Sequence, residues 1–134
     1  MKKLTVVAAV ITYQEKYLCA LKGEHKYSYL SHKYEFPGGK VEPDETAQQA
    51  LIREISEELN LAIDVKSYLL TVEHCYPDFQ IELATYLCEA NSIDELVLHE
   101  HQDIKWHHVD ELQQLDWAAA DIPIVEYLLN IKSI

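Results

Sequence analysis

The sequence predicts an α/β fold. Short β-branched runs, a central amphipathic helix, further strand-like segments and a final helix alternate along the chain. The 134 residues leave room for a real core, and a hydrophobic content of 49% argues against a disordered chain. We therefore expect one domain that spans residues 1–134.

Two strands are predicted at the start of the chain. Residues 4–12 are apolar and rich in β-branched side chains, which is typical of a buried strand. Residues 13–16 are expected to turn, and residues 17–22 to return as the hairpin partner. The polar, tyrosine-rich segment 23–33 is expected to be a loop that covers a site.

Two of the three glycines of the chain, Gly38 and Gly39, precede the central helix. Adjacent glycines are typical of a sharp turn or of a close approach of the backbone to a ligand, and we expect a turn here. Asp44 is the predicted N-cap of the helix, and Glu45 is expected to place negative charge in its first turn.

The central helix combines an apolar stripe with a cluster of carboxylates. The stripe is formed by Ala47, Ala50, Leu51, Ile55 and Leu59. Glu54, Glu57 and Glu58 share one face because of their i, i+3, i+4 spacing, and this face borders the stripe instead of lying opposite it. Carboxylates that repel each other there reduce stability unless a divalent cation binds. Carboxylate and carbonyl oxygens suit Mg²⁺, for which Mn²⁺ can substitute; the alternative is an ordinary acidic helix surface.

The later segments alternate between strand and helix patterns, with expected strands at 62–73 and 79–89, a connection over 91–98, a strand containing Trp106 and a helical turn over 109–112. The final helix is expected to end near Lys132. Asp121 fits its N-cap, and Pro123 fits its first turn.

The stretch from Gly39 to Leu61 resembles the Nudix box, Gly-x5-Glu-x7-Arg-Glu-U-x-Glu-Glu-x-Gly-U, where U is aliphatic. Glu45 and the run Arg53-Glu54-Ile55-Ser56-Glu57-Glu58 fall at the defined positions. One position differs, because Asn60 stands where the box has Gly. Asn is a common substitute in the left-handed conformation that ends a helix. The resemblance implies an α/β/α sandwich with a central mixed sheet.

The resemblance also implies the residues of a metal site. The metal ligands that it implies are the Gly38 carbonyl and the carboxylates of Glu54, Glu57, Glu58 and Glu100. Glu100 is included because it lies six residues before Trp106, in the place where MutT-like members of the family carry a metal-binding Glu. Glu54 is the candidate general base, and Arg53 and Glu45 are expected to position the carboxylates. His99 and His101 flank Glu100, but an imidazole metal cluster is disfavoured because Mg²⁺ prefers oxygen.

Residues 35–40 are identical to the Glu-Phe-Pro-Gly-Gly-Lys of the MutT-like branch, which places Gly39 and Lys40 at the substrate. In that branch a basic residue at the position of Lys22 touches phosphates, and Phe36 lines the base pocket. A solvated Lys22 and a purely structural Phe36 are equally open. Phe79 or Ile81 is expected to help form the nucleobase pocket, since apolar faces sandwich bases well.

Asp121 has a second interpretation. Its Ala-Asp-x-Pro context occurs at the same place in the CTP pyrophosphohydrolase branch, whereas the branch that hydrolyses 8-oxo-dGTP tends to have Asn. A carboxylate accepts a hydrogen bond from the amino group of cytosine. A protonated Asp can still pair with an oxidised purine, so this preference is weak.

The activity implied by the resemblance is hydrolysis of a nucleoside triphosphate to the monophosphate and pyrophosphate, on CTP- or dCTP-type or oxidised nucleotides. The alternatives are a MutT-type 8-oxo-dGTP diphosphatase, a hydrolase of other nucleoside diphosphate derivatives, an isoprenoid diphosphate isomerase and a non-catalytic nucleotide-binding module. The isomerase and the binding module are disfavoured. The first requires a catalytic Cys, for which the contexts of Cys19 and Cys75 do not match. Modules that bind a nucleotide without hydrolysing it commonly lose carboxylates of the box, whereas this chain keeps Glu45, Glu54, Glu57 and Glu58.

Composition excludes further classes. A net charge of −12 argues against binding of a nucleic-acid polymer. No secretory signal or membrane-spanning run is recognised. Cys19, Cys75 and Cys88 are expected to be buried or half-buried thiols in a reducing cytoplasm. We expect a cytoplasmic monomer or homodimer.

Overall fold

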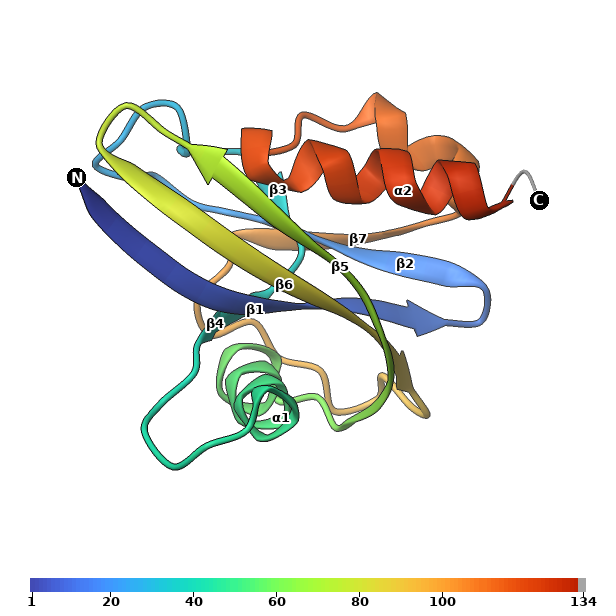
Figure 1. Cartoon of the computed structure of the whole chain (residues 1–134). Coiled ribbons are helices and arrows are strands. Elements are labelled where there is room, and N and C mark those ends of the chain that lie inside the picture. Colours follow the sequence, from blue (N-terminus) through green and yellow to red (C-terminus); the bar gives the residue numbers. More distant parts are fainter. Residues whose placement is uncertain (133–134) are drawn as a thin grey trace.

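The protein has three layers, with a mixed sheet between helices on both faces (Figure 1). In the computed structural model, residues 1–132 are described. Helix α1 (Ala47–Leu59) covers one face of the sheet. Helix α2 (Ile122–Lys132) covers the other, together with the 3-10 helices η1 (Val109–Gln114) and η2 (Ala119–Asp121). The α/β/α sandwich expected from the sequence is confirmed.

The sheet has seven strands: β1 (Lys2–Tyr13), β2 (Lys16–Leu21), β3 (Tyr34–Glu35), β4 (Gly38–Lys40), β5 (Ile63–Cys75), β6 (Phe79–Ala90) and β7 (Asp103–His107). Their order is β3-β2-β1-β6-β5, with β4 paired to β1 and β7 paired to β2. The β1–β6 pair is parallel and the other pairs are antiparallel, so the sheet is mixed as expected.

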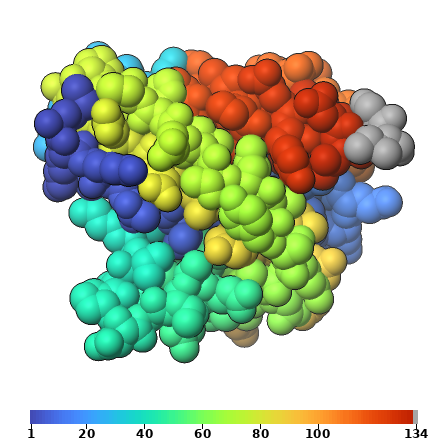
Figure 2. All heavy atoms as spheres, in the orientation of Figure 1, coloured from blue at the N-terminus to red at the C-terminus, as the bar shows by residue number. Residues whose placement is uncertain are grey.

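Strand β1 divides the core in two because successive side chains point to opposite faces. Val7, Ala9 and Ile11 pack toward α1, whereas Ala8 and Val10 pack toward α2. A continuous apolar run is therefore required in this strand, since both of its faces are buried. Figure 2 shows the result from outside: α1 and the segment before it form a lobe on one side of the sheet, and α2 lies on the opposite side.

The predicted glycine turn is wrong. Gly38 and Gly39 lie in β4, and neither glycine has a positive φ. They are needed for space instead, because β4 lies directly against β1. A Cβ atom on Gly38 would lie 1.9 Å from the Val7 carbonyl oxygen.

The predicted start of α1 is also wrong. Asp44 adopts a left-handed φ of 68°, whereas an N-cap residue requires an extended backbone. Thr46 has that backbone and forms a capping box with Gln49. Glu45 therefore precedes the helix instead of charging its first turn. At the other end, Asn60 has a φ of 51° and caps the helix in the left-handed conformation that the sequence predicts.

Two further observations concern the burial of the cysteines and the length of the helices. Cys19 and Cys88 are buried, but Cys75 is exposed, because it ends β5 next to the β5–β6 turn. Among residues 1–132, no helix is long and apolar enough to cross a membrane.

Candidate functional site

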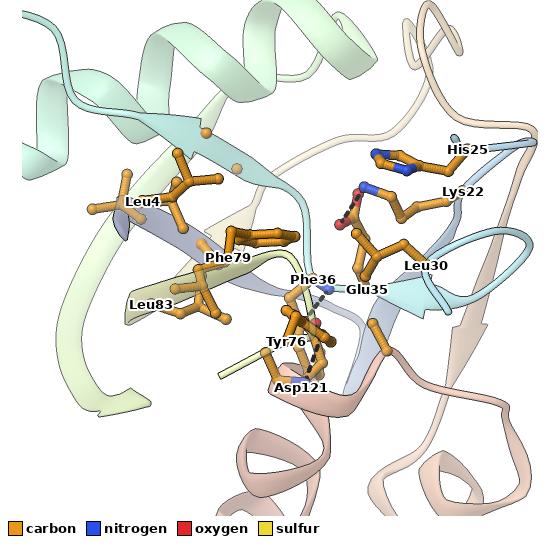
Figure 3. A pocket seen from close by; sticks show the side chains of 18 residues that line it. Leu4, Lys22, His25, Leu30, Glu35, Phe36, Tyr76, Phe79, Leu83 and Asp121 are labelled. Atoms are coloured by element: carbon orange, nitrogen blue, oxygen red, sulfur yellow. Dashed lines mark hydrogen bonds and ion pairs between the residues drawn. The ribbon is translucent and has the colours of Figure 1, made fainter. Parts of the chain in front are cut away.

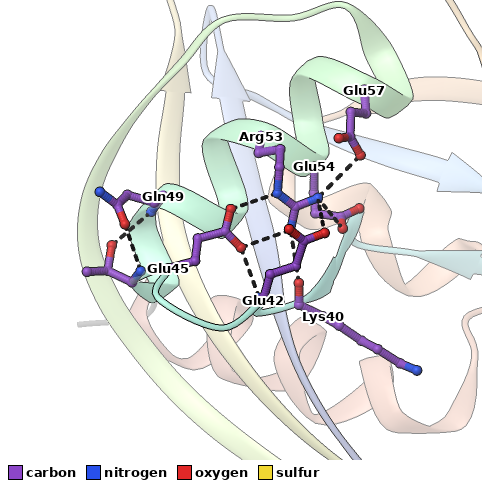
Figure 4. Close-up of polar contacts among 8 residues, drawn as sticks. Lys40, Glu42, Glu45, Gln49, Arg53, Glu54 and Glu57 are labelled. Atoms are coloured by element: carbon purple, nitrogen blue, oxygen red, sulfur yellow. Dashed lines mark hydrogen bonds and ion pairs between the residues drawn. The ribbon is translucent and has the colours of Figure 1, made fainter.

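Arg53 connects the segment before α1 to the carboxylates on the helix (Figure 4). Its guanidinium binds Glu45 in a bidentate pair, with N–O distances of 2.7 and 2.9 Å. It also donates to Glu54 Oε1 at 3.0 Å, Glu57 Oε2 at 3.3 Å and the Lys40 carbonyl at 3.1 Å. A planar fork of donors is suited to hold several carboxylates at fixed positions.

Glu45 completes this arrangement from the other side. One of its carboxylate oxygens also accepts a hydrogen bond from the Glu42 amide. The hydrogen bonds from Arg53 lower the pKa of Glu45 to about 2. The Arg53–Glu45 pair is thus charged across the ordinary pH range, and it ties the loop after β4 to the helix.

The three helix carboxylates differ in burial. Glu57 is exposed, Glu54 is partly buried, and Glu58 is only 3% exposed. Burial, followed by the charges of Glu100, Glu35 and Glu54, raises the pKa of Glu58 to about 9. Its Oε2 atom is buried without a hydrogen-bond partner. The prediction that these acids border the packed face is confirmed for Glu54 and Glu58, whereas Glu57 points to solvent.

Gly39 places the β4 backbone directly against Glu54. A Cβ atom at this position would lie 2.4 Å from the Glu54 carboxylate carbon and 2.6 Å from both oxygens. The glycine therefore leaves the space that the carboxylate occupies. Lys40, the next residue, has an exposed side chain, and only its carbonyl takes part in the cluster.

A largely apolar cavity of about 220 Å³ opens on the α2 side of β1 and β6 (Figure 3). Its apolar walls include Leu4, Phe36, Tyr76, Phe79, Ile81 and Leu83. Phe36 both lines the cavity and belongs to the core, since its ring stacks on that of Trp117 with 4.6 Å between the ring centroids. Phe79 and Ile81 both line the cavity, so the structure brings together the two residues between which the sequence left the choice open.

Asp121 lies at the end of η2, at the wall of this cavity, and is 5% exposed. Its Oδ1 atom accepts a hydrogen bond from the Phe36 amide at 3.0 Å. The side chain thus contacts the backbone between β3 and β4 instead of the amides of α2, for which the sequence suggested it as a cap. Burial, together with the charge of Glu35, raises the pKa of Asp121 well above its ordinary value.

A second, more polar cavity of about 300 Å³ adjoins the first. Lys22, His25, Glu35 and Gly38 line both cavities. The second cavity also contains Glu58, Glu100 and His101. The structure therefore brings Glu100, which is forty-two residues from Glu58 along the chain, to the same cavity as Glu58, whereas Glu54 and Glu57 are not among the residues that line it.

Residues 2–128 match the NUDIX domain family. The chain belongs to the Nudix family. It is 36% identical to the CTP pyrophosphohydrolase of Escherichia coli K12 over 134 residues, covering 99% of this chain and 96% of that protein. It is 30% identical to the 8-oxo-dGTP diphosphatase of the same organism over 131 residues, covering 98% and 100%.

Solved Nudix structures agree with this relationship. The Escherichia coli ORF135 protein superposes with a TM-score of 0.81 at 34% identity, covering 98% of this chain and 92% of that one. The DNA mismatch repair protein MutT of methicillin-resistant Staphylococcus aureus 252, a member of the Nudix hydrolase family, superposes with a TM-score of 0.74 at 42% identity, covering 97% of this chain and 98% of that one.

Nudix hydrolases generally use a divalent metal, and this chain carries donor atoms whose chemistry suits one. The second cavity offers hard oxygen donors, and the buried Glu58 Oε2 atom has no other partner. Within the described part of the chain, however, no three acidic, His or Cys side chains gather closely enough to hold an ion. Glu57 instead directs its carboxylate to Arg53.

Sequence reasoning did not single out Glu35 or Tyr76 as site residues. Glu35 binds Lys22 at 3.3 Å and His101 at 2.9 Å, and its place within the Glu-Phe-Pro-Gly-Gly-Lys motif was the available signal. Tyr76 lines the apolar cavity, and its hydroxyl accepts a hydrogen bond from the Ala120 amide. No local pattern identifies Tyr76, because its role depends on the approach of η2 to β5.

Proposed function

We propose that this chain is a Mg²⁺-dependent nucleoside triphosphate pyrophosphohydrolase that acts on CTP- or dCTP-type or oxidised nucleotides. The products are the nucleoside monophosphate and pyrophosphate. The observation that carries this proposal is the juxtaposition of two cavities with shared walls. One is apolar and ends at Asp121, and the other is polar and holds Glu58 and Glu100. A base fits the first and a charged phosphate chain the second.

The metal site is proposed from the donor set. Glu54, Glu57, Glu58, Glu100 and the Gly38 carbonyl are the proposed ligands of Mg²⁺ or Mn²⁺. A bound divalent cation supplies neutralisation of the phosphates and orientation of water. Glu54 is the proposed general base, and Arg53, itself bound to Glu45, holds its carboxylate in place through a hydrogen bond.

The phosphate chain is proposed to lie along Lys22 and the β4 backbone. Lys22 lines both cavities, so its ammonium is available to a phosphate at their boundary. Gly39 and Lys40 continue this edge toward Glu54. Phosphoryl transfer depends mainly on such positioning and on charge stabilisation.

The nucleobase is proposed to lie among Phe36, Phe79 and Tyr76, with Asp121 at its polar edge. Because burial raises the pKa of Asp121, its carboxyl group is able to donate as well as accept a hydrogen bond. A neutral carboxyl group matches the acceptor and donor edge of cytosine, and it also matches an oxidised purine. Similarity to the CTP pyrophosphohydrolase over nearly the full length favours cytidine substrates.

Three properties expected from the sequence complete the proposal: a single domain over residues 1–134, a cytoplasmic monomer or homodimer, and no nucleic-acid polymer or membrane as partner. A MutT-type 8-oxo-dGTP diphosphatase is the second candidate function, favoured by the 30% identity to the Escherichia coli enzyme of that name.

The deciding experiment measures release of pyrophosphate with Mg²⁺ from CTP, dCTP, 5-methyl-dCTP, 8-oxo-dGTP and the other common triphosphates, and release of nucleoside monophosphate from a dinucleotide polyphosphate, whose single cleavage frees no pyrophosphate. Preference for cytidine nucleotides supports the first candidate, and preference for 8-oxo-dGTP supports the second. Release from the dinucleotide alone points to hydrolysis of other nucleoside diphosphate derivatives. The absence of pyrophosphate or monophosphate from every compound contradicts the proposed function.

A further inference from the structure

His101 lines the polar cavity, and neither the Nudix box nor the proposed chemistry uses it. Its side chain is 4% exposed. The Nε2 atom lies 2.9 Å from Glu35 Oε2 and 3.9 Å from Glu58 Oε1. The imidazole therefore lies close to two carboxylates: that of Glu35, which borders the apolar cavity, and that of Glu58, which belongs to the proposed metal site.

The loop that carries His101 is fixed on both sides. The His99 amide donates to the Glu58 carbonyl at 2.9 Å, which ties the loop to the end of α1. The Gln102 amide donates to the Leu21 carbonyl at 2.9 Å, which ties it to β2. Because these backbone hydrogen bonds flank Glu100 and His101, the backbone from which both side chains extend is held in place.

The hydrogen-bond chemistry defines the direction of the contact. An ionised carboxylate only accepts hydrogen bonds, so the Nε2 atom carries the proton and donates to Glu35. The other oxygen of Glu35 is bound by the Lys22 ammonium at 3.3 Å. Glu35 is thus held by one partner on each oxygen.

Glu35 is close enough to enter the metal site if this hold is lost. The two distances from His101, 2.9 and 3.9 Å, add to 6.8 Å, so the facing oxygens of Glu35 and Glu58 are at most that far apart. A Mg²⁺ ion that binds two oxygens at about 2.1 Å spans only about 4.2 Å between them. A side-chain rotation that moves the Glu35 carboxylate by about 3–4 Å is therefore enough to make it an additional ligand.

We propose that His101 is a positioning residue whose Nε2–H keeps Glu35 out of the metal site and at the boundary of the base cavity. The proposal rests on the proposed function. A cation with an extra carboxylate ligand is bound more tightly, but this carboxylate occupies a coordination position that the substrate phosphates need. It also removes Glu35 from Lys22. Loss of His101 therefore strengthens metal binding while it weakens turnover, a combination that loss of packing alone does not produce.

The test compares His101→Leu, which removes the donor, with His101→Gln, whose amide reaches a similar position. Mn²⁺ binding to the full chain without nucleotide is measured by electron paramagnetic resonance, and pyrophosphate release is measured separately. For His101→Leu we expect Mn²⁺ affinity to rise about tenfold and kcat to fall about 10–100-fold. His101→Gln is expected to retain both values within about threefold, because the hydrogen bond persists.

Two further variants make the result specific. His101→Asn, whose amide is too short to reach Glu35, is expected to behave as His101→Leu does and serves if the latter fails to fold. In a Glu35→Gln background, His101→Leu is expected to leave Mn²⁺ affinity unchanged, since no carboxylate remains to move. His99→Leu, an exposed position in the same loop, is the matched control.

The proposal is overturned if removal of the donor weakens Mn²⁺ binding, if His101→Gln is as impaired as His101→Leu, or if the effect persists without the Glu35 carboxylate. These results can be distinguished from a failure of the proposed function. A wild-type chain that releases no pyrophosphate contradicts that function, whereas the Mn²⁺ titrations still decide the role of His101.

Discussion

Gly39→Ala is expected to remove activity while the fold remains. The added Cβ atom would lie 2.4 Å from the Glu54 carboxylate carbon, whereas ordinary contact begins at 3.4 Å. The carboxylate therefore has to move by about 1 Å, and a misplacement of this size costs about 100-fold in rate. The clash involves the far end of a flexible side chain, so we expect the free energy of unfolding to fall by less than about 1 kcal/mol.

The other two glycines provide controls for this prediction. A Cβ atom on Gly38 would meet the Val7 carbonyl oxygen at 1.9 Å, so Gly38→Ala is expected to lower the melting temperature markedly. A Cβ atom on Gly23 meets nothing within 4 Å, and Gly23→Ala is expected to keep the wild-type melting temperature. Pyrophosphate release and thermal melting are measured on all three variants. If Gly39→Ala keeps its kcat within about threefold, the positional role of Glu54 is refuted.

Three further predictions concern the Arg53–Glu45 ion pair, the protonation of Asp121 and the packing of Ile55. Arg53→Lys loses the bidentate contact to Glu45, so kcat for pyrophosphate release is expected to fall about 10–100-fold with the fold retained; unchanged kcat contradicts the role of the guanidinium. Because the pKa of Asp121 is raised in the folded chain, the folded state holds a proton that the unfolded state releases above about pH 4, and wild-type stability falls as pH rises from there. Asp121→Asn lacks this loss, so its melting temperature relative to wild type is expected to increase from pH 4 to pH 7; a constant difference argues against a raised pKa. Ile55 is fully buried on the face of α1 that packs against the sheet, so Ile55→Ala is expected to cost about 2–5 kcal/mol in denaturant unfolding, and a much smaller loss would contradict close packing there.

Much of the site was predictable because its residues lie close together in sequence. The spacing of Glu54, Glu57 and Glu58 fixes their common helix face, and the buried position of Glu58 confirms the angular argument. Asn60 ends the helix in the left-handed conformation, as its place in the box predicts. These features depend on local geometry, which a sequence pattern reports directly.

Features that depend on tertiary contact were harder to predict. The role of the glycines follows from the pairing of β4 with β1, which no local signal reveals. Asp is a residue type that often caps helices, but the backbone of Asp44 is left-handed, and Thr46 caps the helix instead. Glu35 was missed because its partners, Lys22 and His101, come from β2 and from a distant loop.

The central claim is that carboxylates of α1 hold a divalent cation that supports pyrophosphate release. Its most direct test is the initial rate of pyrophosphate release as a function of Mg²⁺ concentration for wild type, Glu54→Gln and Glu57→Gln, with folding verified by circular dichroism. We expect a wild-type rate that rises with Mg²⁺ and disappears with a chelator, and a rate for folded Glu54→Gln that is lower by about 10²–10⁴-fold. Glu57→Gln is expected to lose activity as well. Full turnover in both folded variants would contradict the metal-centred account.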